Sequence, residues 1–263
     1  LKTMKQVRDY ARTGFPVFIT GESGTGKDLV AMALHNLSSR KGKPFVAQNC
    51  SAIPETLLES ELFGHVKGAF TGAVQDKEGI FSAADSGTLF LDEVANLNMD
   101  IQAKLLRALE THEFKPVGAS RYKKADVRFI AATNRDIESL VKRREFREDL
   151  FFRLNAFTIR IPPLRERPED IFELIRFFAA QYSRTYRTGT RPMPKTLEML
   201  QGYAFPGNVR ELKNLIKQTV VMGENEMMNG FLKRRLEAAP SAVTTRNASD
   251  SFGGLREQIQ AFE

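Results

Sequence analysis

The sequence has no tryptophan and a single cysteine, Cys50, among its 263 residues. One cysteine cannot form an internal disulfide, so a disulfide scaffold is excluded, a reducing compartment is expected, and Cys50 is interpreted as a small buried hydrophobe. Long hydrophobic runs are also absent. Segments such as Phe15–Thr20 and Thr88–Leu91 are far shorter than the ~18–20 residues that a bilayer crossing needs. No basic and then apolar leader opens the sequence, so we expect a cytoplasmic protein with no membrane partner.

The remaining composition is that of an ordinary folded chain. Hydrophobic residues make up 42% and charged residues 27% of the sequence, which excludes a disordered or collagen-like chain. The 39 Lys and Arg against 32 Asp and Glu leave a net charge of +7. This charge fits a nucleic-acid or polyphosphate ligand and, equally, a solvated basic face. His35, His65 and His112 show no metal-ligand spacing with other candidate ligands, so no structural zinc is expected.

Short apolar runs alternate with stretches of helical period in the first two thirds of the chain. This alternation is typical of an α/β domain built around a mostly parallel sheet. Between the first two expected strands, Val30, Ala33, Leu34 and Leu37 recur at helical spacing, which predicts a helix with one apolar stripe against the sheet. The expected strands are Val17–Thr20, Pro44–Asn49, Thr88–Leu91, Val127–Ala132 and Phe157–Ile161.

A second, all-helical subdomain is expected after a cluster of prolines. Pro162, Pro163 and Pro168 break the pattern, and no strand-like segment follows before about residue 237. After about residue 237, small and polar residues dominate the sequence, as in a flexible linker. The predicted helical restart is carried by Ile171, Leu174, Ile175 and Phe178. The expected domains are residues 1–168 (α/β), 169–237 (helical) and 238–263 (linker and the start of a further domain), so we expect a piece of a longer protein.

A glycine-rich string follows the first expected strand and opens the first expected helix. Glycines allow positive φ, which turns backbone N–H groups inward around phosphates, and Lys27 would reach the outer phosphate oxygens. The strict P-loop pattern has Ser or Thr after the lysine as a magnesium ligand, whereas this sequence has Asp28. A loose glycine-rich turn therefore stays open as the alternative. The candidate cofactor-binding residues are Gly21, Glu22, Ser23, Gly24, Thr25, Gly26, Lys27 and Asp28.

Two adjacent acids end the expected strand Thr88–Leu91. Strand ends of an open parallel sheet are where ligands bind. An acid there can hold Mg²⁺ directly or through water, and its neighbour can activate water for attack on the γ-phosphorus of ATP. We assign Asp92 to the metal and Glu93 to the water. Two solvated acids at a strand end are the alternative, which the upstream P-loop disfavours.

Eight strings stand in one order along residues 15 to about 225: GESGTGK, ELFGH, GAFTGA, GTLFLDE, AATNRD, FREDLFFRLN, PPLRERPEDI and PGNVRELKN. In this order they resemble the central domain of the sigma-54-dependent transcriptional activators, which are bacterial enhancer-binding proteins of the AAA+ superfamily. The resemblance implies an α/β AAA+ P-loop NTPase fold, with a parallel-sheet subdomain followed by a small all-helical lid. An acidic residue is usual in that family at the position of Asp28.

The resemblance also implies a contact loop for the sigma factor. In the relatives, the hexapeptide that matches Gly68, Ala69, Phe70, Thr71, Gly72 and Ala73 extends toward sigma-54 when ATP is bound and retracts after hydrolysis. An exposed aromatic on a mobile, glycine-flanked loop is typical of a partner contact. An ordinary surface turn whose Phe70 folds back on the domain is the alternative. The segment Val117–Lys124 resembles the companion loop that supports the first.

The remaining site residues come from the resemblance alone. It implies that Asn49 pairs with Glu93 as a switch, that Asn134 is a sensor near the γ-phosphate, and that Arg210 is a second sensor. Arg147 and Arg153 resemble arginine fingers that reach a neighbouring subunit's nucleotide. The alternatives are local roles: backbone capping for the asparagines, and surface pairing with Glu148 or Asp149 for the arginines.

Together these matches imply an ATPase that uses Mg²⁺ and ATP as a hexameric or heptameric ring. The ring would remodel sigma-54 RNA polymerase holoenzyme from the closed to the open promoter complex in a bacterial cytoplasm. Enhancer DNA would be bound by a C-terminal domain beyond this sequence, and a regulatory domain would precede it. A ring ATPase that unfolds proteins or moves DNA, and an ATP-binding switch with little turnover, are the rival hypotheses.

Overall fold

A computed structural model of the chain describes residues 2–187, 200 and 203–222. The chain divides into an α/β unit, residues 3–162, and a helical unit that begins at Pro163. The expected boundaries at residues 168 and 237 stay predictions. The expected linker and domain start, residues 238–263, lie outside the described residues. No helix among the described residues is long and apolar enough to span a bilayer.

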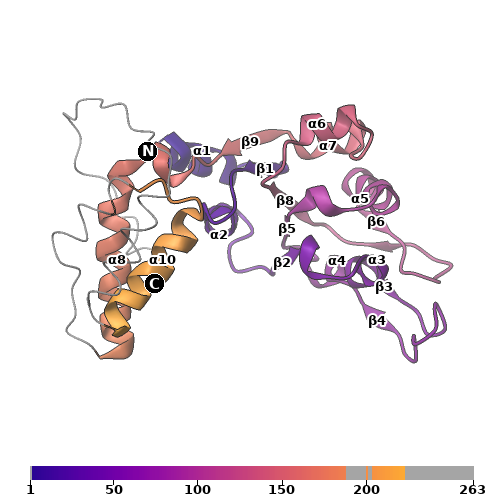
Figure 1. The fold of residues 1–263 in the computed structure, drawn as a ribbon. Helices are drawn as coiled ribbons and strands as arrows, with labels where there is room; N and C mark the ends of the chain where they lie inside the picture. Colours follow the sequence, from indigo (N-terminus) through magenta and orange to yellow (C-terminus); the bar gives the residue numbers. More distant parts are fainter. Residues whose placement is uncertain (1, 188–199, 201–202, 223–263) are drawn as a thin grey trace. The chain divides into compact units, whose positions relative to one another are not determined.

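The α/β unit is built on a five-stranded sheet in the order β2-β5-β8-β1-β9 (Figure 1). Every neighbouring pair in it is parallel, as the strand and helix alternation predicts. Each strand begins and ends within one residue of its predicted bounds. The strands are β1 (Val17–Thr20), β2 (Phe45–Asn49), β5 (Thr88–Asp92), β8 (Arg128–Thr133) and β9 (Phe157–Arg160).

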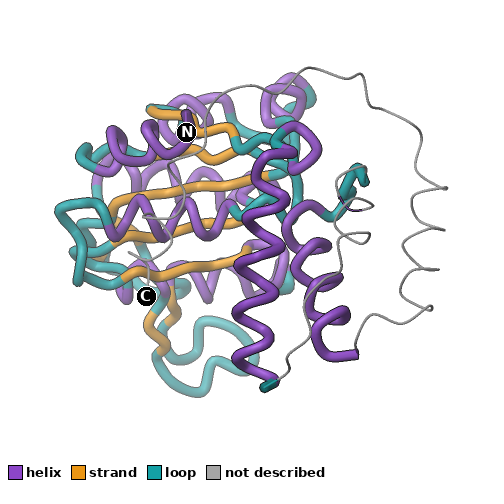
Figure 2. The backbone as a smooth tube through the Cα atoms, turned by 90° about the vertical axis from the view of Figure 1, so that its left-hand side faces the viewer, coloured by secondary structure: helices purple, strands orange, loops and turns teal. Residues whose placement is uncertain are grey.

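Alternate residues of the strands face two separate hydrophobic cores, because side chains on a strand point to opposite sides of the sheet. On β5, Leu89 and Leu91 enter one core and Phe90 enters the other. The first core also holds helices α3 (Glu55–Phe63), α5 (Met99–Thr111) and α7 (Glu148–Leu154). The second holds α1 (Lys2–Ala11) and α2 (Lys27–Asn36). The strands lie side by side between these helices in Figure 2.

Helix α2 confirms the predicted helix but not all of its stripe. Ala33 and Leu34 are buried as expected, whereas Leu37 is 45% exposed. The reason is that α2 ends at Asn36 and Leu37 is its C-cap, so the stripe loses its last member. His35 is buried instead, and its Nδ1 lies 2.9 Å from Thr88 Oγ1. Burial lowers the pKa of His35, as expected for a cationic form taken out of water.

The helical unit confirms the predicted helical restart. Pro168 begins α8 (Pro168–Tyr186), where the missing N–H of proline is tolerated. Ile171, Ile175 and Phe178 are buried against α10 (Asn208–Met222), and Leu174 is partly buried there. The described part of this unit also has the short 3₁₀ turn η3 (Leu164–Glu166) and no strand. Asn208 opens α10 and its Oδ1 accepts a bond from the Leu164 backbone N–H at 2.8 Å.

Two short antiparallel ladders complete the α/β unit. They are β3 (Gly64–His65) with β4 (Lys77–Glu78), and β6 (Glu113–Phe114) with β7 (Lys123–Lys124). Their connecting loops lie side by side at one end of the unit (Figure 1). Two short helices, α4 (Ile80–Ala83) and α6 (Ile137–Lys142), and the 3₁₀ turns η1 (Cys50–Ala52) and η2 (Val94–Asn96), link the remaining elements. Cys50 is buried, as predicted.

Candidate nucleotide site

The glycine-rich string forms a tight loop between β1 and α2. Gly24 and Gly26 adopt φ of 79° and 96°, which L side chains rarely tolerate and glycine does. Gly26 is the N-cap of α2 without a side-chain cap, so the first N–H groups of this helix are free of a capping side chain. Thr25 Oγ1 donates to the Glu22 carbonyl at 2.8 Å and closes the loop. The predicted string therefore has the strand, loop and helix context that a phosphate cradle requires.

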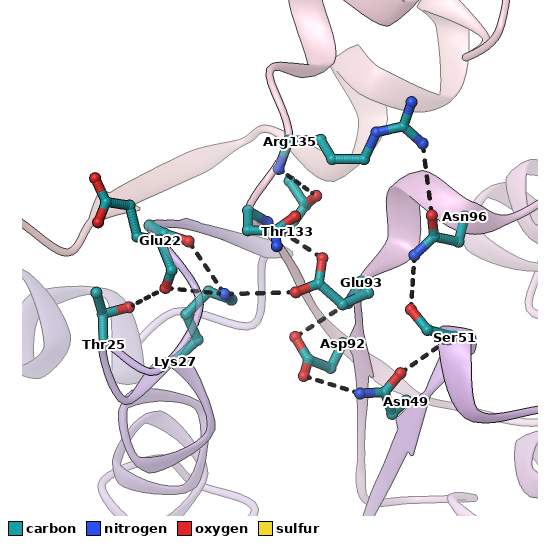
Figure 3. Close-up of polar contacts among 12 residues, drawn as sticks. Glu22, Thr25, Lys27, Asn49, Ser51, Asp92, Glu93, Asn96, Thr133 and Arg135 are labelled. Carbon is teal, nitrogen blue, oxygen red and sulfur yellow. Dashed lines mark hydrogen bonds and ion pairs between the residues drawn. The ribbon is translucent and has the colours of Figure 1, made fainter. Parts of the chain in front are cut away.

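Lys27 is buried at the start of α2, and its ammonium lies over the loop. Its Nζ donates to the Gly21 carbonyl at 3.1 Å and the Glu22 carbonyl at 3.4 Å. The same Nζ lies 3.6 Å from Glu93 Oε1, and both side chains are largely buried (Figure 3). The structure thus brings the P-loop lysine and the predicted water-activating acid together. Asp28, next to Lys27, is exposed.

Glu93 is held in place at the end of β5. Its backbone is left-handed, with φ 54° and ψ 45°, a conformation that costs about 1–2 kcal/mol for a residue with a Cβ. Glu93 Oε2 accepts a bond from the backbone N–H of Asn134 at 3.2 Å. Asn134 follows β8 and its side chain is exposed. The predicted sensor therefore meets Glu93 through its main chain.

The structure lacks the contact between Asn49 and Glu93 that the resemblance implies. Asn49 Nδ2 instead makes a long contact, 3.5 Å, with Asp92 Oδ2. The reason is strand register: Asn49 and Asp92 are paired across β2 and β5, so they point to the same side, and Glu93, one residue further on, does not. Asn49 Oδ1 also accepts from the Ser51 N–H at 2.8 Å, which is the local capping role of the alternative.

Asp92 has the surroundings of a carboxylate that a cation would stabilise. Burial and the adjacent Glu93 carboxylate raise the pKa of Asp92. A divalent ion would reverse this cost, since it favours the charged form. The described residues hold no group of three or more His, Cys, Asp or Glu side chains suited to a metal.

The predicted arginine fingers lie together around α7, away from the other site residues in sequence. Arg147 is the N-cap of α7, and its Nε and Nη2 donate to Asp149 at 3.0 and 2.6 Å. This bidentate pair lowers the pKa of Asp149, and it agrees with the surface-pairing alternative within one subunit. Arg153 is exposed and forms no ion pair with an acid among the described residues. Arg210 lies in the first turn of α10, in the helical unit, and its role stays a prediction.

The hexapeptide Gly68–Ala73 forms a closed turn at the tip of the β3–β4 connection. Gly68 N–H donates to the Ala73 carbonyl at 2.8 Å, and Ala73 N–H donates to the Phe70 carbonyl at 3.0 Å. Phe70 is 39% exposed, with its ring edge-on to His65 at 5.0 Å between centroids. Phe70 thus combines partial exposure with a contact to its own domain. Val74, the residue after the hexapeptide, is 78% exposed.

Polar residues without a predicted role connect the nucleotide site to its surroundings. Arg135 Nη1 lies 3.5 Å from Asn96 Oδ1, and Asn96 Nδ2 donates to Ser51 Oγ at 2.7 Å (Figure 3). Arg135 lies inside the string AATNRD, and Asn96 stands shortly after GTLFLDE, so these positions were the available signal. Ser51 follows Asn49 in the same way. These contacts join the carboxyl ends of β2, β5 and β8.

Known proteins of similar sequence cover most of this chain. A Nif-specific regulatory protein of Azotobacter vinelandii is 49% identical over 224 residues, which are 85% of this chain and 43% of the relative. A formate hydrogenlyase transcriptional activator of Salmonella typhimurium is 45% identical over 97% of this chain and 37% of its own length. The chain therefore spans about two fifths of the curated relatives that it matches.

Solved structures are also similar to this chain over most of its length. NtrX from Brucella abortus superposes with a TM-score of 0.79 and 36% identity, over 85% of this chain and 51% of that protein. The same protein in complex with ATP has a TM-score of 0.78. The profile of the Sigma-54 interaction domain matches residues 1–160, and that of the AAA+ ATPase lid domain matches residues 165–247. The chain belongs to the sigma-54 interaction domain family, with a AAA+ lid after that domain.

Proposed function

We propose that this chain hydrolyses ATP, and that it uses the energy to remodel sigma-54 RNA polymerase holoenzyme from the closed to the open promoter complex. The observation that carries the ATPase part is the cluster of Lys27, Glu93 and the Asn134 N–H. In this cluster the Lys27 Nζ lies 3.6 Å from Glu93 Oε1, and Glu93 Oε2 accepts a bond from the Asn134 backbone N–H, which supports the proposal. The transcriptional part is supported by family membership and by what the relatives are called.

Each residue has a separate task in the proposed reaction. The P-loop backbone and Lys27 would bind the β- and γ-phosphates of ATP and neutralise their charge. Glu93 would orient and activate the attacking water, because its carboxylate stands at the strand end with one oxygen held by Asn134. Mg²⁺, when bound through Asp92, would offset charge on the phosphate oxygens.

The arginines around α7 would complete the reaction from a neighbouring subunit. A cation that reaches the transition-state phosphate can contribute on the order of 10³–10⁵ in rate. Arg147 would have to leave Asp149 to do so, and Arg153 is exposed without such a step. A lone subunit would then hydrolyse ATP slowly, so assembly into a hexameric or heptameric ring becomes part of catalysis.

Loop Gly68–Ala73 would carry the force to the sigma factor, and Arg210 would carry the phosphate state to the helical unit. Enhancer DNA binding would belong to a further domain. The alternative, an ATP-binding switch with little turnover, has one observation in its favour: the bidentate pair of Arg147 with Asp149 holds this arginine within its own subunit.

The test is the steady-state ATPase rate against protein concentration, with and without sigma-54, for the wild type and Arg147→Ala. Specific activity that rises with concentration and collapses in the variant supports catalysis between subunits. Arg176→Ala is the matched control, since this exposed arginine also pairs with an acid, Glu173, on its own helix. Slow hydrolysis that is independent of concentration and unchanged in Arg147→Ala would instead support the switch.

A further inference from the structure

The amide side chain of Gln102, on helix α5 of the α/β unit, is completely buried. Gln102 has 0% exposure and stands on α5 among the apolar residues Ile101 and Leu105, which face the first core. Glutamine is rarely buried unless its polar atoms are bonded, because an unmade hydrogen bond inside a protein is costly. The bonds of Gln102 therefore show why a glutamine stands at this position.

All the recorded side-chain bonds of Gln102 go to the main chain of two other segments. Its Nε2 donates to the Leu97 carbonyl at 2.7 Å and to the Glu145 carbonyl at 3.2 Å. Its Oε1 accepts from the Arg147 backbone N–H at 2.8 Å. Both amide hydrogens are thus used, and a single side chain joins residues 97, 145 and 147.

The first of these segments begins at the reaction centre. Leu97 follows Glu93 by one 3₁₀ turn, η2, whose N-cap is Glu93 itself. The carbonyl that Gln102 holds is therefore separated from the left-handed backbone of Glu93 only by this short turn. Leu97 is also buried, so this end of the connection is anchored.

The second segment is the turn that presents Arg147. Glu145 N–H donates to the Leu140 carbonyl at 2.9 Å, Arg144 has a φ of 59°, and Phe146 is buried. Arg147 is the N-cap of α7 and has no side-chain cap of its own. Gln102 thus bonds the main chain on both sides of Phe146 and fixes the point from which the Arg147 side chain departs.

A second link between these segments runs through Arg135, which follows β8, and is more exposed. Arg135 Nη1 donates to the Ala95 carbonyl at 3.4 Å, and its Nη2 lies 3.6 Å from Glu145 Oε2, with side chains 42% and 50% exposed. Exposed pairs of this kind contribute little, because water screens them and two long side chains lose freedom. The buried amide is therefore the stronger connection between the segment that follows Glu93 and the turn before α7.

We propose that Gln102 is a positioning residue for the arginine finger. It holds the main chain at Glu145 and Arg147 in a fixed position relative to Leu97, so that the Arg147 guanidinium, once it leaves Asp149, starts from the position needed to reach the nucleotide of the neighbouring subunit. The inference rests on the proposed function, since it assumes that Arg147 acts between subunits. Gln102 touches no substrate in this role and acts only through Arg147.

The test substitutes Gln102→Met, which keeps the size of the side chain and removes its donors and acceptor. We expect kcat to fall by on the order of 10²-fold, as for other small misplacements of a catalytic group, with little change in the KM for ATP. Leu109→Ala is the control for a loss of stability without a loss of positioning, because it removes buried apolar atoms from α5 and lies two turns from Gln102. It should lower the thermal midpoint and leave kcat within a few-fold.

A mixing experiment separates positioning from a general loss of structure. Gln102→Met subunits keep their own reaction centre, and Glu93→Gln subunits keep their own arginines, so a mixture should be more active than the sum of its parts. Arg147→Ala mixed with Glu93→Gln calibrates the same effect. Restoration with Arg147→Ala but not with Gln102→Met would overturn the inference.

Two further outcomes would count against the proposed function and not against the role of Gln102 alone. Full activity of Arg147→Ala, or an inactive Arg147→Ala that Glu93→Gln does not restore, would count against the proposed function itself. If Gln102→Met does not fold, Gln102→Glu is mixed in the same way. It keeps the length of the side chain but turns a carboxyl group toward two carbonyl oxygens, so it should also lose activity and regain it in the mixture.

Discussion

Gly118 packs so closely against Ala69 that a methyl group in its place would lie 2.7 Å from the Ala69 Cβ. Gly118 belongs to the loop between β6 and β7, and Ala69 to the hexapeptide turn. The two loops are also joined by main-chain bonds, from Val66 N–H to the Val117 carbonyl at 3.1 Å and from Val117 N–H to the Gly64 carbonyl at 2.9 Å. This contact gives a physical basis for the expectation that the second loop supports the first.

Gly118→Ala should displace the hexapeptide turn and leave the nucleotide site intact. The added methyl group must push Ala69 away, and the φ of 75° adds backbone strain of about 1 kcal/mol. We expect ATPase activity within a few-fold of wild type and a large loss of sigma-54 retention measured with ADP and aluminium fluoride. Gly42→Ala shares a positive φ, 82°, but meets nothing within 4 Å, so it should retain sigma-54. Equal retention by both variants would contradict a supporting role for Gly118.

Phe70→Ala and Thr71→Ala should separate ATP hydrolysis from promoter opening. Both residues lie in the hexapeptide turn. There the Phe70 ring contacts His65 and not the nucleotide cluster. ATPase activity should stay within a few-fold, and open-promoter formation should be lost, measured by transcription from a sigma-54 promoter. Val74→Ala, which shortens the most exposed apolar side chain of this region, is the comparison. Loss of hydrolysis in both loop variants would mean that the loop is structural.

Glu93→Gln should bind ATP and assemble but not turn over. The substitution keeps the size of the side chain and an acceptor for the Asn134 N–H, and it removes the base that activates water. A fall in kcat of at least about 10²-fold is expected for the loss of a general base. ATP binding can be measured by equilibrium titration and assembly by light scattering, with Glu78→Gln on the exposed strand β4 as the control. Normal hydrolysis by Glu93→Gln would remove the role assigned to this residue.

The sheet was predictable because buried parallel strands form short continuous apolar runs. Val17–Thr20 is such a run, and the structure has β1 at those residues. The acids after Thr88–Leu91 could be placed for the same reason, since the carboxyl ends of parallel strands share one edge. Periodicity does not show where a helix ends. It predicts that Leu37 belongs to the apolar stripe of α2, whereas the helix ends at Asn36.

Contacts set by three-dimensional register could not be predicted in this way. The family resemblance implies that Asn49 pairs with Glu93, whereas the register of β2 and β5 places Asn49 opposite Asp92. Gln102 had a weaker signal: a polar residue inside the apolar stripe of a helix. What it bonds depends on Leu97 and on a turn more than forty residues away, and no local pattern in the sequence indicates that contact.

Asp92→Asn should stabilise the fold at neutral pH while it impairs hydrolysis. Burial and Glu93 raise the pKa of Asp92 above its ordinary value of 3.8. The contribution of Asp92 to stability is therefore fully present below pH 3.8 and is lost as the pH rises through the raised pKa. At pH 7 the ionised side chain is a net cost, which Asn removes. The bond that Asn loses is the long one to Asn49.

The expected gain at pH 7 is on the order of 1 kcal/mol, the size typical of one stabilising substitution. Urea unfolding at pH 7 and near pH 4 measures it, and the difference between variant and wild type should shrink at the lower pH, where Asp92 takes up its proton. Asp28→Asn is the matched control: it removes the same charge from an exposed position in the first turn of α2, where a carboxylate favours the helix, so it should slightly destabilise. A stability loss in Asp92→Asn at pH 7 would show that Asp92 is favourably charged in the folded chain, and that no cation is needed to offset its burial.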